Sequence, residues 1–426
     1  MGRLWQVIKQ PHYGWIILVS AFFVFACDSI SERSMPYLIP SMEAELNLSH
    51  GEMGNIVAGY FIAFAIMNPV WGNLSDRIGP RKCILIGQCF IIAGLSGMGF
   101  THSLISSLLF YILCGIGAAA QVTCAVAIIS RWFGSNRRGR ANGIFMSAVG
   151  VTVLTLGLVI PKILIDFSWR WSWWIFAIVV TIIIIFSWRL LVNNPEEKDL
   201  SPIGTNKEDL SLSPREDTKE SLAKIEPKVT IKDIMKRMIT CNLGGIFFAW
   251  GVGYIIFATF GVTYLQEMDW SAKEAARVFA IWGALSIPSA IIWGILADRL
   301  TKKYVLLIML AIQAIGMFVF LSSNPVARYA GVSMVGFTYV GIFATMASAI
   351  GDYYEPKVIG TAFGIITGIM GAGLAVGPAI GGHLADMSGT LNTAFLFGLG
   401  ALIVSFLLTL VLKKPAKRPA YIPNNQ

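Results

Sequence analysis

The chain has 426 residues, of which 55% are hydrophobic and only 13% are charged, and its net charge is +9. A soluble globular chain carries roughly 25% charged residues, so this composition excludes an ordinary soluble protein and indicates a membrane protein. A net positive charge also permits nucleic-acid binding, but the basic residues are distributed as membrane topology requires, and we expect no nucleic-acid partner.

Twelve apolar stretches are long enough to cross a lipid bilayer, because a membrane-spanning helix needs about 20 mainly apolar residues. This pattern predicts an all-α integral membrane fold of twelve transmembrane helices. In chain order the stretches are 14–40, 54–74, 83–100, 104–130, 141–165, 171–192, 242–266, 275–297, 304–323, 327–350, 360–384 and 391–412.

The links between these stretches differ in their content of Lys and Arg. Residues 41–53 and 385–390 contain neither, whereas the links on the other side are basic. Because positive residues stay in the cytoplasm, we expect both termini to be cytoplasmic and the protein to lie in the plasma membrane, of the bacterial inner-membrane type. The basic links contain Arg77, Arg81 and Lys82, then Arg131, Arg137, Arg138 and Arg140, then Arg299, Lys302 and Lys303.

The first stretch holds three ionisable residues, Asp28, Glu32 and Arg33. Ionisable groups within a membrane span are costly, so each is a candidate for function. Asp28 and Glu32 are four residues apart and share a helix face, where two carboxylates cannot easily both ionise; one then holds a proton and couples proton movement to transport. Arg33 lies about 100° further round the helix and is a candidate to bind a carboxylate substrate through two parallel hydrogen bonds.

The alternative that Asp28, Glu32 and Arg33 serve only the stability of the protein remains open. Arg33 can neutralise Glu32 or Asp28 in a salt bridge that serves only stability, and some of the groups can lie in an outer vestibule.

Residues 193–241 are polar and carry nine basic and ten acidic side chains. We interpret them as a cytoplasmic linker between the sixth and seventh spans, with a disordered first part and a short surface helix at 229–238. The domains are then an N-terminal six-helix bundle (1–192), the linker (193–241) and a C-terminal six-helix bundle (242–426).

The two bundles repeat each other. Residues 72–77 (GNLSDR) align with 294–299 (GILADR) at an offset of 222, and 132–143 align with 353–364 at an offset of 221. Two matches at nearly one offset, in equivalent loops, indicate duplication of a six-span unit. Both copies have the same orientation, so an axis along the membrane normal relates them and a substrate site is expected between them.

The loop after the second span reads GNLSDRIGPRK and resembles the signature loop of the major facilitator superfamily. The second copy is degenerate, with Thr301 where the first has glycine. The resemblance covers all twelve spans and implies a secondary transporter in which the loop locks one conformation and releases it in another. The alternative is that its basic residues only hold topology. The expected lock residues are Gly72, Asp76, Arg77, Gly79, Arg81, Lys82, Asp298 and Arg299.

The chain resembles more than one subfamily of this superfamily. The loop 131–143 is similar to that of monocarboxylate porters and oxalate/formate antiporters, but Ala290 stands where those porters often carry arginine. The pair Glu32-Arg33 is similar to the first span of organic anion:cation symporters, whose Arg and Glu in the fourth span are replaced by Tyr111 and Ala118.

Spans one, four, seven and ten line the cavity in this superfamily. The resemblance therefore makes Gln121, Tyr254 and Tyr339 candidates for substrate binding beside Arg33. Packing, or a hydrogen bond between helices, is the alternative for each of the three.

We expect a secondary active transporter that moves a small organic anion, a monocarboxylate, together with protons, and that acts as a monomer. An anion exchanger, a drug or metabolite exporter and a transporter-like membrane sensor are the alternatives. The chain has no Gly-x-x-x-x-Gly-Lys-Ser/Thr loop, no CxxC pair and no catalytic cluster, so we expect neither an ATP-driven pump nor an enzyme, and no cofactor or metal.

Overall fold

The computed structural model describes residues 12–204, 235–354 and 359–413 of the chain. Within these ranges the chain is helical, apart from short links and one isolated parallel bridge between Phe133 and Ile203. Eleven helical segments are long and apolar enough to cross a membrane, and there are twelve if the two parts of a bent helix, 272–289 and 291–297, form one span. The prediction of an all-α fold with twelve transmembrane helices is confirmed.

Most helices begin or end a few residues beyond the apolar stretches that predict them, because polar caps extend them. Ser49 and Glu52, for example, form a capping box that starts the second span at His50. The long helices are α1 (Tyr13–Arg33), α2 (Met35–Leu46), α3 (His50–Ile78), α4 (Pro80–Gly99), α5 (Leu104–Trp132), α6 (Ser135–Asp166), α7 (Trp169–Leu190), α11 (Met238–Glu267), α12 (Ala272–Arg299), α13 (Lys302–Phe320), α14 (Pro325–Tyr353), α15 (Ile359–Ser388) and α16 (Leu391–Val411).

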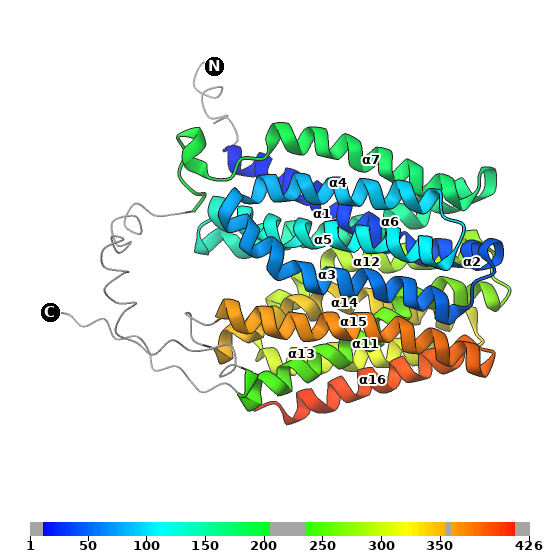
Figure 1. Ribbon diagram of the computed structural model, residues 1–426. Helices are drawn as coiled ribbons and strands as arrows, with labels where there is room; N and C mark the ends of the chain where they lie inside the picture. Colours follow the sequence, from blue (N-terminus) through cyan, green and yellow to red (C-terminus); the bar gives the residue numbers. More distant parts are fainter. Residues whose placement is uncertain (1–11, 205–234, 355–358, 414–426) are drawn as a thin grey trace, which may run out of the picture.

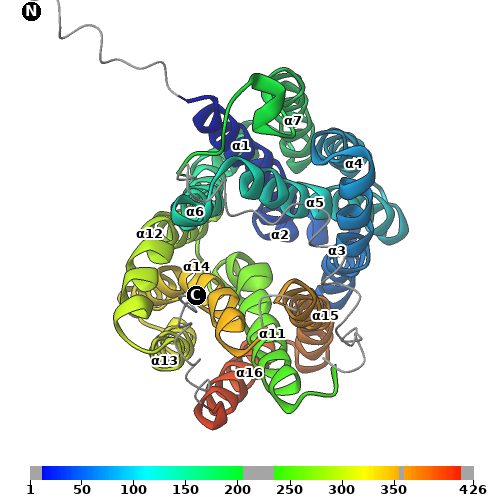
Figure 2. The same ribbon diagram turned by 90° about the vertical axis from the view of Figure 1, so that its left-hand side faces the viewer.

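The long helices run side by side along one direction (Figure 1). Seen along that direction, α1–α7 lie on one side of the molecule and α11–α16 on the other (Figure 2). The two groups meet mainly along α3 with α15 and along α6 with α12. We call the end where α1 begins and the basic links lie the basic end, and the other end the far end.

The first expected span, 14–40, is not one helix. It breaks at Ser34 into α1 and α2, which together run from Tyr13 to Leu46. Pro36 has no N–H and cannot donate to the carbonyl of Glu32, so one helical hydrogen bond is missing at this break. The Tyr111 hydroxyl lies 3.2 Å from the carbonyl oxygen of Ser31 and 3.3 Å from that of Glu32 and donates to them there.

The two groups of helices are packed tightly at the far end. A side chain at Gly54 would strike the backbone of Pro378, and one at Gly382 would strike the backbone of His50, so α3 and α15 approach as closely as glycine allows. Toward the basic end, Gly143 of α6 and Gly368 of α15 have no described atom within 4 Å of an added Cβ. The structure therefore packs α3 and α15 closely at the far end, whereas positions 143 and 368 toward the basic end have free space beside them.

The first part of the expected linker is folded where the structure describes it. Residues 195–198 form a turn of 3₁₀ helix, and Ile203 bonds by its backbone to Trp132 and Gly134, so this segment packs on the link between α5 and α6. The expectation of a disordered start is wrong for 193–204. The expected surface helix at 229–238 falls largely outside the described residues.

We predict that Gly54→Ala lowers the melting temperature of the purified protein. Alanine is favoured over glycine in a helix by roughly 0.5–1 kcal/mol, but at this position its methyl group strikes the Pro378 backbone. Gly368→Ala is the matched control, because the new methyl meets no described atom within 4 Å, and it should raise the melting temperature slightly. Equal melting temperatures for the two variants would contradict the close-packed far end.

Candidate functional site

Arg33 lies at the break between α1 and α2, and its side chain faces the second group of helices. The residue is only 7% exposed. Its Nη1 donates to the hydroxyl of Tyr254 on α11, and its Nη2 donates to the hydroxyl of Tyr339 on α14 at 2.7 Å. One guanidinium therefore joins the two halves of the molecule near the middle of its helices.

A stack of three aromatic rings forms the wall opposite Arg33. Tyr254 and Tyr339 are nearly parallel with their centroids 4.4 Å apart, and Trp250 stacks on Tyr254 at 5.2 Å. The indole Nε1 of Trp250 donates to Gln313 at 2.8 Å, which fixes the end of the stack. The Arg33 guanidinium lies 5.5 Å and 5.4 Å from the two tyrosine centroids, within the range of cation–π attraction.

Glu32 pairs with Arg33 in this conformation. Its Oε1 lies 2.8 Å from Nη2 of Arg33, with both side chains largely buried. Nε of Arg33 is buried and has no hydrogen-bond partner among the described residues. The Arg33–Glu32 salt bridge, which the sequence left open as a purely structural alternative, is thus present. The guanidinium also has an unpaired donor, Nε, and two neutral partners, Tyr254 and Tyr339.

Asp28 lies one turn before Glu32 and is buried, with 4% of its surface exposed. Its carboxylate accepts a hydrogen bond of 3.0 Å from the hydroxyl of Tyr60 on α3. The Tyr60 ring packs 4.9 Å from that of Tyr111, whose hydroxyl bonds to the broken end of α1. Asp28 is therefore held within the first group of helices, one turn behind the side chains that face the second group.

In this conformation a cavity of about 10 Å³, with room for about one water molecule, adjoins the Arg33–Glu32 pair. Its lining includes Val57 and Phe61 of α3 and Thr259 of α11, besides Arg33 and Glu32. The space is mainly apolar, so the pair supplies most of its charge. A small ligand that enters here meets one cation, one anion and aliphatic or aromatic walls.

Gln121 does not join this group. It is fully buried, and its side-chain amide donates to the backbone oxygens of Ile84 at 3.1 Å and Gly117 at 3.2 Å. It lies between α4 and α5, so we do not keep it in the proposed site. Arg33, Tyr254 and Tyr339, which come from the first, seventh and tenth spans, are brought together.

The signature loop lies at the basic end, away from Arg33. Gly79 has φ +89°, which favours glycine, and a side chain there would crowd Asn193. The Asn193 side chain accepts from the backbone N–H of Arg81 at 2.9 Å, and the Arg81 guanidinium donates to the carbonyl of Trp188. Asp76 and Arg77 are exposed, and no ion pair of either with another described residue is present.

Three residues near the centre were not expected from the sequence. Trp250, Tyr60 and Tyr111 were not singled out as parts of the site, although Tyr111 was noted as the replacement for a family arginine. The spacing of Trp250 and Tyr254, one helical turn apart in a span without charges, was a usable signal. Tyr60 carried no signal, because its contact with Asp28 depends on how α3 packs against α1.

Comparisons with known proteins agree with this architecture. The family model described as Major Facilitator Superfamily matches residues 17–300 and 243–426. The chain is similar to a hexuronate transporter of Bacillus subtilis (21% identity, over 96% of this chain and 97% of that protein) and to monocarboxylate transporter 13 of Rattus norvegicus (22% identity, over 90% and 85%). The crystal structure of a D-xylose-proton symporter superposes with a TM-score of 0.72 at 16% identity, over 95% of this chain and 98% of that one.

We predict that Glu32→Gln destabilises the protein by about 3–5 kcal/mol, because it leaves the buried Arg33 guanidinium without a counter-charge. Unfolding in detergent, followed by circular dichroism, measures the change. Asp352→Asn is the matched control: it breaks the Lys302–Asp352 pair, whose side chains are 24% and 38% exposed, and such pairs contribute about 1 kcal/mol or less. A Glu32→Gln variant as stable as Asp352→Asn would contradict the importance of the central pair.

Proposed function

Because the chain belongs to the Major Facilitator Superfamily, we propose that it carries a small monocarboxylate together with protons by alternating access. Membership makes it a multi-pass membrane protein and a secondary transporter of small organic substrates rather than an enzyme. The finer statement, on the anion and the coupling ion, depends on the chemistry of the central site.

The observation that carries the proposal is the placement of one buried guanidinium between the two halves. Arg33 is the cation in that space, and its planar fork matches a carboxylate through two parallel hydrogen bonds. Relatives named as a hexuronate transporter and a monocarboxylate transporter support a carboxylate as the substrate. The ring stack of Tyr254 and Tyr339 supplies hydroxyls and an aromatic face for the rest of the molecule.

Glu32 gives a direct route to proton coupling. In this conformation its carboxylate forms an ion pair with Nη2 of Arg33, so a substrate carboxylate must displace the Glu32 carboxylate. When a proton binds Glu32, the neutral acid no longer competes for the guanidinium, and Arg33 exchanges one carboxylate partner for another. Proton and anion then enter together, and the charge of the site is unchanged. Asp28, one turn away, is the second candidate to hold the proton.

We propose that the two groups of helices move as units, an N-terminal bundle (1–192) and a C-terminal bundle (242–426) joined by the linker (193–241). In this proposal the basic end is the open one in this conformation, and Asp76 and Arg77, which are exposed there, form new contacts when that end closes. We therefore assign the signature-loop residues to a lock that engages in the opposite conformation.

We place the protein in a bacterial-type inner membrane with both termini in the cytoplasm, so that the basic end faces inward. The Arg- and Lys-rich links at that end and a bacterial relative support this orientation. A single chain supplies both walls of the site, which supports a monomer as the transporting unit.

We predict that proteoliposomes containing the protein accumulate a labelled monocarboxylate when the outside is acidic. Lactate and a hexuronate are the test substrates, and a neutral hexose is the control, because it carries no charge to pair with Arg33. Arg33→Lys keeps the charge but loses the planar fork and should lower uptake at least about tenfold. Full transport by Arg33→Lys, or uptake indifferent to the pH gradient, would contradict the proposal.

A second prediction separates proton coupling from exchange. Glu32→Gln removes the titratable carboxyl but leaves the guanidinium, so counterflow between labelled and unlabelled substrate should continue while accumulation driven by the pH gradient is lost. Asp28→Asn, measured in parallel, reports whether the second carboxyl carries the proton instead. Wild-type protein that shows counterflow but no response to a pH gradient is an exchanger, which is the alternative function.

A further inference from the structure

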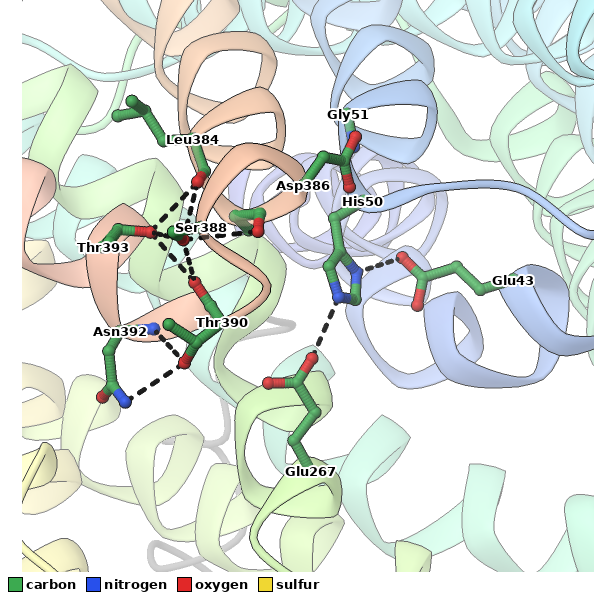
Figure 3. A network of polar contacts seen from close by, with 11 residues as sticks. Glu43, His50, Gly51, Glu267, Leu384, Asp386, Ser388, Thr390, Asn392 and Thr393 are labelled. Carbon is green, nitrogen blue, oxygen red and sulfur yellow. Dashed lines mark hydrogen bonds and ion pairs between the residues drawn. The ribbon is translucent and has the colours of Figure 1, made fainter.

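A second cluster of ionisable residues lies at the far end, outside the central site. Figure 3 shows His50 at the start of α3 between Glu43 of α2 and Glu267 at the end of α11, with Asp386 of α15 beside it. The helix α2 separates this cluster from Arg33, and its twelve residues span roughly 18 Å at 1.5 Å per residue. The cluster is therefore not part of the substrate site.

The imidazole of His50 contacts a carboxylate through each ring nitrogen. Nδ1 lies 2.8 Å from Oε1 of Glu43, and Nε2 lies 2.9 Å from Oε1 of Glu267. A neutral imidazole has one N–H and one lone pair, so it can donate to only one of the two carboxylates. With both carboxylates ionised, both contacts are hydrogen bonds only when the ring carries two protons and a positive charge.

The contact with Glu267 crosses between the two groups of helices, whereas the contact with Glu43 stays within the first. A second polar contact crosses at the same place, because Asp386 accepts the backbone N–H of Gly51 at 2.9 Å. That N–H belongs to the first turn of α3, where it has no partner within the helix. The cluster thus joins α3 to both α11 and α15 where the two groups are packed most closely.

The charges around His50 are mainly negative. Glu43 faces it from α2, Glu267 from α11 and Asp386 from α15, while His383 of α15 packs near Gly51 and lies 3.3 Å from the Asn55 amide. On its own helix, Glu52 is half-buried, and its carboxylate accepts the backbone N–H of Ser49 at 2.9 Å. Three carboxylates around one imidazole favour its charged form. The side chains of His50, Glu43 and Glu267 are 13–30% exposed, so water and protons can reach them.

We propose that His50 is a second proton-binding site of this protein, separate from the carboxylates of α1, and that its protonated form latches the far end shut. When His50 loses its proton to water at that end, the ring can no longer donate to both Glu43 and Glu267. One carboxylate then faces a lone pair, so the Glu43–His50–Glu267 bridge between the groups is weakened. Opening at the far end is therefore favoured as the pH rises and disfavoured as it falls.

The latch rests on alternating access and not on which substrate is carried, so it can be tested without substrate. We would place spin labels at Phe100, which directly follows α4, and at Met387 of α15, exposed positions at the far end of the two groups. The exposed native cysteines Cys89 and Cys241 are replaced by serine first. Label-to-label distances in nanodiscs then report the ratio of closed to open molecules.

In the wild type, the short-distance population should fall as the pH is raised, with a change in the closed-to-open ratio of at least about fivefold, the lower range of couplings between sites. His50→Gln and Glu267→Gln should both lower the closed population at neutral pH and remove its pH dependence. Glu52→Gln is the matched control: it neutralises a carboxylate two residues from His50, and glutamine still serves in a capping box, so its distances should follow the wild type. A His50→Gln variant with the pH response of the wild type would overturn the proposal.

The protonation state of His50 can be measured directly, which covers the case in which the substitutions disturb folding. The chain has only four histidines, so carbon-13 labelling of histidine and comparison with His50→Gln assigns the signal. The latch requires a doubly protonated ring at neutral pH that titrates over the same range as the distance change. A neutral His50 ring at pH 7 would overturn the latch, whereas failure of carboxylate transport would overturn only the proposed function.

Discussion

The structure depends on a positive charge buried between two groups of helices. An isolated charge in an apolar interior is very costly, so Arg33 must keep partners in every conformation. Here the break after α1 places it beside Glu32, and two tyrosines of the second group accept hydrogen bonds from its Nη1 and Nη2. The same contacts hold the halves together at mid-height. A substrate carboxylate is a suitable replacement for these partners, because it neutralises the same charge with the same geometry.

Contacts at the far end, the middle and the basic end explain how the two groups of helices can move relative to each other. At the far end, glycines let α3 and α15 approach closely and His50 bridges to Glu267. At the middle, Arg33 is the link, and toward the basic end Gly143 of α6 and Gly368 of α15 have free space beside them. Packed interfaces of this kind tend to have discrete arrangements rather than a continuous range. Exchange of partners at the middle and at the far end therefore favours one arrangement over the other.

Protons can act at two places under this scheme. At the centre, a proton on Glu32 releases Arg33 to the substrate, which links the proton to the anion in one step. At the far end, a proton on His50 strengthens the bridge that keeps the substrate from leaving by that route. The central site couples the proton to the anion, and the site at His50 determines how readily the far end opens. The two are separated by the length of α2, so single substitutions can be expected to affect them independently.

Much of the fold was determined by the sequence alone, because spanning a bilayer requires long apolar helices and repeated loops reveal duplication. The twelve spans were predicted to within a few residues, apart from the break at Ser34, although Pro36 marks it. Arg33 was singled out as an ionisable group within a span, and Tyr254 and Tyr339 as polar groups in spans that the family resemblance places at the cavity. Their roles stay a proposal. What only the tertiary structure decided was which groups meet. Gln121 looked equivalent to Tyr254 but bonds to backbone in another interface, and His50 and Glu267, more than two hundred residues apart in the sequence, become partners only when α3 and α11 pack. A side chain's residue type gives its chemistry, but its partner depends on helix packing that no local pattern encodes.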